Sequence, residues 1–198
     1  MWTFEQNAKK KGYAVIAGID EVGRGPLAGP VVSAAVVLGD NFSVSDITDS
    51  KQLSPIKRDK LYHLIFHHAQ AVSLGMVEND VIDKINILQA ALLSMLYAVE
   101  KLCHPPDYVL IDGIYKIDSP VPQETIKKGD QQSISIAAAS IIAKVTRDRM
   151  MTEYAIKYPQ YGFEQHKGYG TKKHRDAIKK YGLCPIHRKT FKGCLEYA

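Results

Sequence analysis

The sequence predicts a single α/β domain. Short apolar runs rich in β-branched residues alternate with longer segments whose apolar residues recur at helical spacing. The runs cover residues 13–19, 31–38, 71–77 and 108–113, and the helical segments cover residues 54–68, 86–102 and 131–158. A length of 198 residues with 45% hydrophobic residues suits one ordinary domain with its own core.

The first two apolar runs are expected to pair as antiparallel strands, because only a turn rich in glycine and proline separates them. Gly23, Gly25 and Gly29 lie in this turn. A Rossmann dinucleotide site needs its glycine loop to open a helix, whereas these glycines lead into another strand. The sequence therefore excludes a dinucleotide site of that type.

Serine, proline and glycine mark the ends of two predicted helices. Ser54 is the expected N-cap and Pro55 the first residue of a helix that ends near His68. A short basic helix is predicted from Thr171 to its stop at Gly182. On the first of these helices we expect Ile56 to belong to the apolar face.

Two segments are expected to lack regular structure. Residues 1–12 are polar and lysine-rich, which is typical of a frayed end. Residues 125–130 are expected to be a loop that leads into the long helix beginning near residue 131. Asp130 then lies near a helix N-terminus, where the partial positive charge favours an ionised carboxylate.

The charge is unevenly distributed along the chain. The net charge is +5, and residues 144–198 hold 13 Lys/Arg against 5 Asp/Glu. A solvated basic face explains this by itself. A basic end beside an acid-bearing first part also suits an enzyme that binds a polyanion and cuts it with metal.

Targeting signals and membrane spans are not expected. The longest apolar runs are far shorter than the roughly 20 residues that cross a bilayer, and the first residues show no leader pattern. The three cysteines, Cys103, Cys184 and Cys194, are scattered and odd in number, which favours reduced thiols in a cytoplasmic protein. We expect a monomer without an obligatory protein partner, and no long docking tail after Phe191.

Four acids stand at the ends of predicted elements: Asp20, Glu21, Asp112 and Asp130. Carboxylate oxygens are the hard ligands that Mg²⁺ prefers. Neighbours on a regular strand point to opposite faces, so Asp20 and Glu21 share one site only if the strand bends or ends there. We reject Asp148 as a further ligand, because it lies within the long helix between two arginines, where an ion pair or helix contact is its ordinary role.

Several motifs together give the chain a resemblance to a known family. In order they are Gly18-Ile19-Asp20-Glu21-Val22-Gly23-Arg24-Gly25-Pro26, Asp49-Ser50-Lys51, Asn86-Ile87-Leu88, Leu110-Ile111-Asp112-Gly113, Lys128-Gly129-Asp130, the run 138–148, His166-Lys167-Gly168-Tyr169-Gly170-Thr171 and His187-Arg188. This order resembles bacterial ribonuclease HII, the type 2 ribonuclease H family, over nearly the whole chain.

The resemblance implies a ribonuclease H-like fold, with a mixed central sheet flanked by helices and a small helical C-terminal appendage. Residues 1–160 would form the catalytic domain, and residues 161–198 a basic appendage that binds substrate and is not an independent domain. It implies an endonuclease that cuts the RNA strand of RNA/DNA hybrids and single ribonucleotides embedded in duplex DNA, in DNA replication and repair. We expect the cut on the 5′ side of the ribonucleotide, leaving a 3′-hydroxyl and a 5′-phosphate.

The same resemblance implies the metal site. Asp20, Glu21 and Asp112 would be the metal ligands and Asp130 the fourth acid. The cofactor would be Mg²⁺ or Mn²⁺, two ions per site, which can activate water, stabilise the developing charge and assist the leaving oxygen.

Substrate contacts are expected at eight positions. A glycine-lined backbone can approach a sugar closely, so Gly23, Arg24 and Gly25 are expected to read the ribose. The resemblance adds Tyr169, whose ring would pack on the adjoining deoxyribose and whose hydroxyl would bond the 2′-hydroxyl. Phosphate or duplex-backbone contacts are expected at Lys51, Lys167, His187 and Arg188.

Two other functions compete with this one. A non-catalytic nucleic-acid-binding module would use the basic C-terminal surface, but it leaves the four acids unexplained. A metal-dependent nuclease acting on branched DNA would use the acids, but it has no need for a turn that reads ribose.

Overall fold

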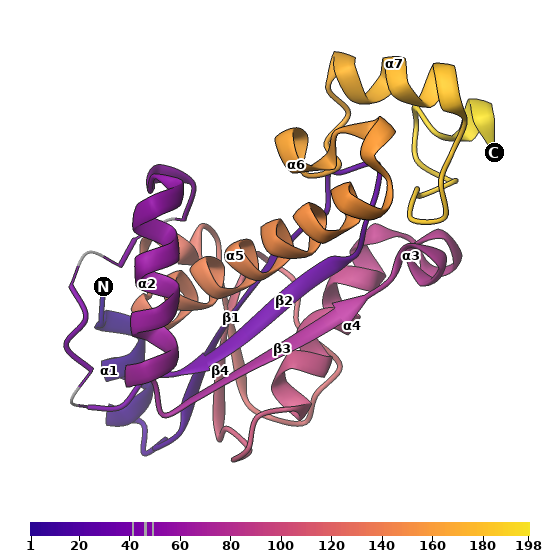
Figure 1. Cartoon of the computed structure of the whole chain (residues 1–198). Helices are drawn as coiled ribbons and strands as arrows, with labels where there is room; N and C mark the ends of the chain where they lie inside the picture. The colour runs from indigo at the N-terminus through magenta and orange to yellow at the C-terminus, as the bar shows by residue number, and fades with distance from the viewer. Residues whose placement is uncertain (41, 46, 49) are drawn as a thin grey trace.

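A mixed sheet of five strands forms the centre of the molecule (Figure 1). The computed structural model describes residues 1–40, 42–45, 47–48 and 50–198, with residue 51 described by its backbone only. The strands are β1 (Ile16–Val22), β2 (Val31–Val37), β3 (Ala71–Val77), β4 (Tyr108–Asp112) and β5 (Gln123–Ile126), in the spatial order β3-β2-β1-β4-β5. β2 is antiparallel to β1 and β3, while β4 runs parallel to β1 and β5. The expected antiparallel pair and mixed sheet are confirmed.

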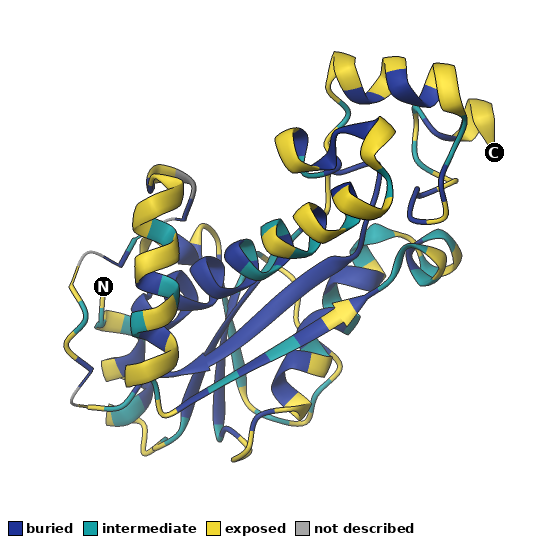
Figure 2. Cartoon of the chain, viewed as in Figure 1, coloured by how far each residue is buried: buried dark blue, intermediate teal, exposed yellow. Residues whose placement is uncertain are grey.

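Helices cover both faces of this sheet. They are α1 (Thr3–Lys10), α2 (Pro55–His68), α3 (Asn79–Ile85), α4 (Ile87–Glu100), α5 (Ile134–Lys157), α6 (Phe163–His166) and α7 (Lys172–Tyr181). α4 packs on one face, while α5 and α2 pack on the other. β1, β2 and β4 are mostly buried between these layers, whereas the edge strands β3 and β5 are partly exposed, as are the outer turns of the helices (Figure 2).

Alternation along β1 assigns its residues to the two faces. Ala17 and Ile19 belong to the apolar cluster that contains Met95 of α4. Gly18 faces α5 instead, and a Cβ there would lie 2.2 Å from the carbonyl carbon of Ser135. Only glycine allows this approach, so the first turns of α5 lie directly against β1.

Small residues continue this close packing along α5. Residues 137–139 are alanines with 0% exposure, and the helix makes its most extensive contacts with β1 and β2. Ser133 caps the helix by accepting a hydrogen bond from the N–H of Ile136 at 3.3 Å. The small side chains of these residues allow the helix to pack tightly on the sheet.

The N-terminal segment is a helix and not the frayed end that we expected. α1 places Glu5 in the interior with 3% exposure. Its Oε1 accepts hydrogen bonds from Ser133 Oγ, Ser135 N and Ser135 Oγ at 2.6, 3.0 and 2.7 Å. The polar composition of residues 1–12 concealed this contact, because a buried glutamate reads as a surface residue in a sequence.

Two further expectations are corrected. Part of the loop expected at residues 125–130 belongs to β5, which pairs in parallel with β4 from Gln123 to Ile126. Ile56 is 85% exposed, whereas Leu61 and Ile65 on the same helix are buried. Ile56 is in the first turn of α2, before the helix reaches the sheet.

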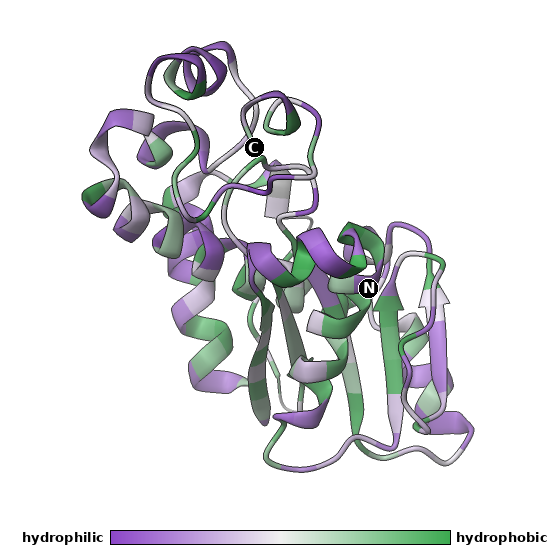
Figure 3. Ribbon diagram, turned by 90° about the vertical axis from the view of Figure 1, so that its right-hand side faces the viewer, coloured by the Kyte–Doolittle hydropathy of each residue, from purple (hydrophilic) through white to green (hydrophobic). Residues whose placement is uncertain are grey.

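The C-terminal part forms a small apolar cluster of its own, which continues onto α5 (Figure 1). Phe163, Ile178 and Cys184 from residues 161–198 pack together with Met151 of α5 and with Leu27 from the turn between β1 and β2. Most of the sheet is hydrophobic (Figure 3), whereas the short edge strand β5, with the residues Gln-Glu-Thr-Ile, is mainly hydrophilic. This part of the chain therefore lies next to the glycine turn.

Within the described part of the chain, no helix combines the length and the hydrophobicity that a bilayer crossing requires. Cys103 is exposed, Cys184 and Cys194 are buried, and all three are free thiols.

Candidate active site

Strand register brings Asp20 and Asp112 together. β1 and β4 are parallel neighbours in which Ile19 is matched with Ile111. Each acid follows its matched isoleucine by one residue, so both leave the carboxyl ends of adjacent strands on the same face of the sheet. This is the face that α5 covers.

Glu21 completes a group of three carboxylates. One oxygen each from Asp20, Glu21 and Asp112 can be chosen such that all three lie within 4.8 Å of one another. β1 continues through Val22, and the chain then turns at Gly23, whose φ is +103°. The strand therefore does not end at the acids, contrary to the expectation, and oxygens of Asp20 and Glu21 nevertheless both lie close to Asp112.

The site is electrostatically strained without a cation. Asp20 is 6% exposed, and burial, followed by the charges of Glu21 and Asp112, raises the pKa of its carboxyl well above the ordinary value. Hydrogen bonds from Ser140 and from the N–H of Glu21, at 2.7 Å, act against this rise in pKa. Burial also raises the pKa of Glu21, against the influence of the Arg24 guanidinium 3.3 Å away.

The donor set fits a divalent metal ion. Three hard carboxylate oxygens converge, which is the ligand type that Mg²⁺ and Mn²⁺ prefer. Their charges repel one another in a partly desolvated position, and a bound cation would offset both the repulsion and the burial. Asp20, Glu21 and Asp112 are the residues that would hold it.

Asp130 lies beside this group but is not a member of it. The 3₁₀ helix Gly129–Gln131 follows β5, and the N–H of Gly129 donates to Asp112 Oδ1 at 2.6 Å. Asp130 itself is 5% exposed. The residue before Asp130 is therefore joined to Asp112 through one hydrogen bond, while the three-acid group is formed by Asp20, Glu21 and Asp112.

The glycine turn adjoins the acids. Arg24 reaches back to Glu21, and a Cβ on Gly25 would lie 3.4 Å from Cε1 of Tyr169. Tyr169 is 42% exposed, so its ring presents a face to solvent beside the turn. The turn is thus in contact with the acids through Arg24 and lies next to Tyr169 at Gly25.

Lys167 and Lys51 are the two lysines that we expected to contact phosphate. Lys167 is partly exposed, and its Nζ donates to Thr152 Oγ1 at 2.9 Å. The side chain of Lys51 lies outside the described residues. Its neighbour Ser50 is buried and hydrogen-bonds Ser140, Oγ to Oγ, at 2.9 Å.

His187 and Arg188 do not match the expected contact with a duplex backbone. Both side chains have 0% exposure, and a residue without exposed surface has no face to offer a phosphate. His187 Nδ1 accepts from the N–H of Cys184 at 2.9 Å. Arg188 directs its guanidinium at carbonyl oxygens of the glycine turn. Their basic side chains suggested that both residues lie on the surface, and their burial shows that this expectation is wrong.

The sequence analysis did not identify Ser140, whose side chain hydrogen-bonds Asp20, because a small residue on a packed helix is ordinarily explained by close packing alone. A serine one helical turn after Ile136, on the face that packs on β1, was the available signal. The rejection of Asp148 as a ligand agrees with its ion pair to Lys144 at 2.8 Å.

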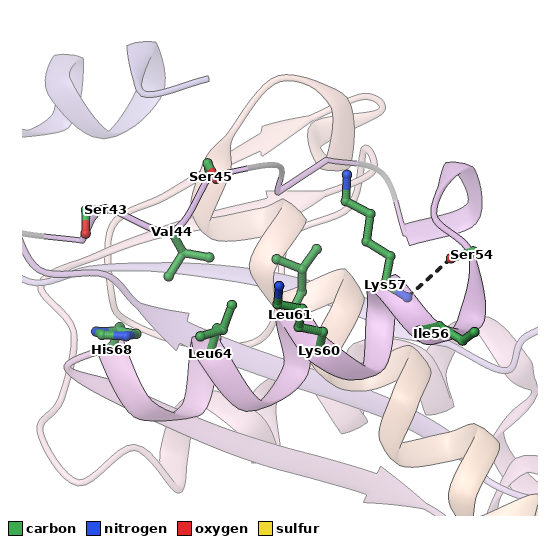
Figure 4. Close-up of a pocket in the computed structure, with 10 residues that line it drawn as sticks. All are labelled: Ser43, Val44, Ser45, Ser54, Ile56, Lys57, Lys60, Leu61, Leu64 and His68. Atoms are coloured by element: carbon green, nitrogen blue, oxygen red, sulfur yellow. Dashed lines mark hydrogen bonds between the residues drawn. The ribbon is translucent and has the colours of Figure 1, made fainter.

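Two cavities bear on the location of the site. One of about 260 Å³ is bordered by Glu21 and Asp112, together with Arg24, Met95 and Tyr115. A larger one of about 640 Å³ lies between α2 and residues 43–45 (Figure 4). None of the predicted site residues whose side chains the structure describes borders the larger cavity, so its size does not mark the chemistry.

A mixed sheet with carboxylates at the ends of its central parallel strands, and a helix over them, defines a ribonuclease H-like metal-dependent nuclease. The family model described as "Ribonuclease HII" matches residues 17–194. The chain is 58% identical to the ribonuclease HII of Geotalea uraniireducens over 194 residues, covering 98% of this chain and 90% of that protein. It is 57% identical to that of Geobacter sulfurreducens over 197 residues, covering 100% of this chain and 91% of that protein.

Among solved structures, the ribonuclease H2 of Pyrococcus horikoshii matches with a TM-score of 0.78 at 27% identity, covering 93% of this chain and 97% of that one. The chain belongs to the ribonuclease HII family. It is a ribonuclease H, a metal-dependent endonuclease that acts on RNA/DNA substrates.

Proposed function

We propose that this ribonuclease H cuts the RNA strand of RNA/DNA hybrids and also incises duplex DNA on the 5′ side of a single embedded ribonucleotide. The observation that carries the proposal is the contact of the three-acid group with a glycine turn that lies against Tyr169. Acids alone would suit any metal-dependent nuclease. A glycine-lined surface beside them suits a close approach to a sugar.

Asp20, Glu21 and Asp112 hold Mg²⁺ or Mn²⁺ in this proposal, and Asp130 is the fourth acid of the site. When bound, two such ions supply an activated water and stabilise the charge on the phosphate and on the leaving 3′-oxygen. Ser140 and the N–H of Glu21 orient Asp20 and favour its ionised form, against the larger effect of burial. The hydrogen bond from Gly129 fixes one oxygen of Asp112 and leaves its other oxygen for a ligand.

The turn distinguishes RNA from DNA in this proposal. The 2′-hydroxyl is the feature that separates the two, and Gly23, Arg24 and Gly25 lie where a strand passing the acids would bring it. Tyr169 packs on the next deoxyribose and bonds the 2′-hydroxyl. Its exposed ring beside Gly25 supports this role.

The basic C-terminal part, residues 161–198, is the substrate-binding appendage in this proposal, with Lys167 as a phosphate contact. Its position next to the glycine turn supports that role. Residues 1–160 provide the catalytic domain. A monomeric state and a cytoplasmic location stay predictions.

The decisive assay uses a labelled DNA duplex that contains one ribonucleotide. Incubation with Mg²⁺, with Mn²⁺ and with chelator, followed by end analysis, should give a 3′-hydroxyl and a 5′-phosphate only when metal is present. An all-DNA duplex and a four-way DNA junction serve as controls and should stay intact. A 2′,3′-cyclic phosphate would identify the 2′-hydroxyl as nucleophile and would overturn the proposal, as would cutting of the junction.

A further inference from the structure

Arg188 is a buried arginine that forms no direct ion pair with a carboxylate in the described part of the chain. Its side chain has 0% exposure. Burial lowers the pKa of its guanidinium to about 9. The charge of Asp83 acts against this fall in pKa without forming an ion pair with the guanidinium. A buried cation is costly unless its donors are hydrogen-bonded, so the hydrogen bonds of this group indicate what it is for.

All of its hydrogen bonds go to carbonyl oxygens of the turn between β1 and β2. Nη2 donates to Gly23 at 2.6 Å and to Gly29 at 2.8 Å. Nη1 donates to Arg24 at 3.1 Å and to Pro26 at 2.9 Å, and Nε donates to Gly29 at 3.0 Å. The planar fork thus gathers four carbonyl groups of one turn around a single guanidinium.

This arrangement sets the direction of the amide groups. Across a planar trans peptide bond the C=O and the following N–H point to opposite sides, and none of the described peptide bonds is cis. Because the carbonyls of Gly23 and Arg24 point inward to Arg188, the N–H groups of Arg24 and Gly25 point outward. Within the described residues, neither N–H donates to a backbone carbonyl.

The arginine is itself held firmly. Asp83 of α3 accepts from the N–H groups of Lys189 and Thr190, at 2.9 and 3.0 Å. The guanidinium lies 5.0 Å from the centre of the Phe191 ring. A group fixed on both sides can impose a conformation on the turn instead of following it.

A second buried arginine provides an internal comparison. Arg147 also has 0% exposure and donates to the carbonyls of Pro30, Ala28 and Lys167 at 2.9, 3.0 and 3.0 Å. It holds the far end of the turn and the appendage. Among the described hydrogen bonds, those from Arg188 alone reach the carbonyls of Gly23 and Arg24.

We propose that Arg188 is a positioning residue, which turns the peptide groups of the glycine turn so that the N–H groups of Arg24 and Gly25 face the ribose of the bound strand. This inference rests on the proposed function and deepens it, since it names the residue that sets ribose recognition from inside the protein. Arg188 touches no substrate.

The test is the preference for ribose, measured as binding. In the Asp112→Asn background, which we expect not to cleave, affinities are compared for a DNA duplex with one ribonucleotide and for the same all-DNA duplex. Arg188→Lys keeps the positive charge but lacks the planar guanidinium group that bonds the four carbonyl groups of the turn. It should reduce the ratio of the two affinities by about tenfold, the scale of one lost hydrogen bond of this type, while all-DNA affinity stays unchanged.

Ile178→Ala is the matched structural control. Ile178 is fully buried in the apolar cluster of the appendage, so its truncation should lower the melting temperature without changing the ratio. An unchanged ratio in Arg188→Lys would overturn the inference. So would an equal loss of both affinities, since that pattern belongs to a purely structural role.

If the Arg188→Lys protein does not fold, a second measurement tests the inference without that variant. In the Asp112→Asn protein with Arg188 intact, the amide NMR signals of Arg24 and Gly25 should shift more with the ribonucleotide duplex than with the all-DNA duplex. Equal shifts would overturn the inference. If the wild-type enzyme does not cut at the ribonucleotide at all, the proposed function fails instead, and the two failures are distinguishable.

Discussion

Asp112 lies beside Asp20 because the strands that carry them are parallel neighbours with Ile111 matched to Ile19. Their separation of 92 positions in the sequence becomes adjacency at the end of the sheet. Asp112 is the last residue of β4 and Asp20 lies two residues before the end of β1, so the rigid backbone of both strands holds their oxygens in place. The site is therefore a consequence of sheet register.

We predict that Asp112→Asn abolishes cleavage and leaves duplex binding largely intact. The amide keeps the hydrogen bond from Gly129 but removes one negative charge from the three-acid group. A metal ligand is then lost without loss of the basic surface. Cleavage rates and duplex affinity measured on the same preparation check this.

Asp148→Asn is the control for that experiment. Its carboxylate is paired with Lys144 on α5 and lies outside the three-acid group. This variant should cleave at a rate close to that of the wild type. Persistent turnover in Asp112→Asn, or loss of binding along with cleavage, would contradict the role given to Asp112.

We also predict that Asp20→Asn makes the metal-free protein more stable at pH 8. The folded-state pKa of Asp20 is raised, so the folded protein keeps a proton that the unfolded chain has released. The free energy of unfolding therefore falls as the pH rises from the pKa of Asp20 in the unfolded chain through its pKa in the folded protein. Asparagine has no titrating carboxyl at this position, so the variant does not lose this stability. The melting temperature with chelator should rise by a few degrees, since 1 kcal/mol corresponds to about 2–4 °C in a domain of this size.

With Mg²⁺ or Mn²⁺ present, the wild type should instead be more stable than Asp20→Asn. A cation that binds only the folded state stabilises it by mass action, so either metal should raise the melting temperature of the wild type and have little effect on Asp20→Asn. Metal-free samples treated with chelator provide the baseline melting temperatures of both proteins. Equal metal-induced shifts in both proteins would count against Asp20 as a ligand.

Much of the fold and the acids were predictable because their signals are local. A strand followed by an acid is visible at Asp20 and again at Asp112, and the Ser54-Pro55 start of α2 was located correctly. The antiparallel β1–β2 pair followed from the short turn between its strands. Each of these features depends on residues close together in the chain.

Features that depend on distant partners were not predictable. Glu5 is buried because Ser133 and Ser135 meet it across 128 and 130 positions. Arg188 is buried because carbonyl groups more than 150 positions earlier surround it. Composition assigns such charged residues to the surface, and only the tertiary fold supplies the partners that allow their burial.

Replacing the two glycines of the turn by alanine should have different effects. Gly23 has φ of +103°, and a Cβ there would lie 2.4 Å from Nε of Arg147, so Gly23→Ala should destabilise the fold. A Cβ on Gly25 meets the Tyr169 ring at an ordinary 3.4 Å. Gly25→Ala should therefore keep the melting temperature within a few degrees but reduce cleavage at a ribonucleotide by at least about tenfold. Thermal unfolding and kcat/KM separate the two cases.

Glu5→Ala should destabilise the protein by roughly 1–3 kcal/mol, the cost of leaving buried hydrogen-bond donors without their acceptor. The truncation leaves Ser133 and Ser135 without their common acceptor at the start of α5. Glu5→Gln keeps an acceptor oxygen and should cost less. Urea unfolding at neutral pH gives both values, and an alanine variant as stable as the wild type would show that α1 does not brace α5.

Acid should unfold the appendage through a buried histidine pair. His174 Nε2 lies 3.0 Å from His187 Nε2. His174 Nδ1 faces the carbonyl of Tyr169 at 3.0 Å, so it carries a proton and its Nε2 accepts one from His187. His187 Nδ1 accepts from the N–H of Cys184. Each ring is therefore neutral, and a further proton on either one breaks a hydrogen bond.

Burial, as the largest cause, lowers the pKa of both histidines to about 4, from the usual 6.5. Between these pH values the unfolded chain binds protons that the folded protein does not. The stabilisation is thus fully present above pH 6.5 and is lost as pH falls toward 4, at up to about 1.4 kcal/mol per pH unit for each group. Urea unfolding between pH 7 and 4.5 measures this slope. His187→Gln should reduce the slope, whereas His67→Gln on the exposed face of α2 should not, and equal slopes in all three proteins would exclude the histidine pair as the cause.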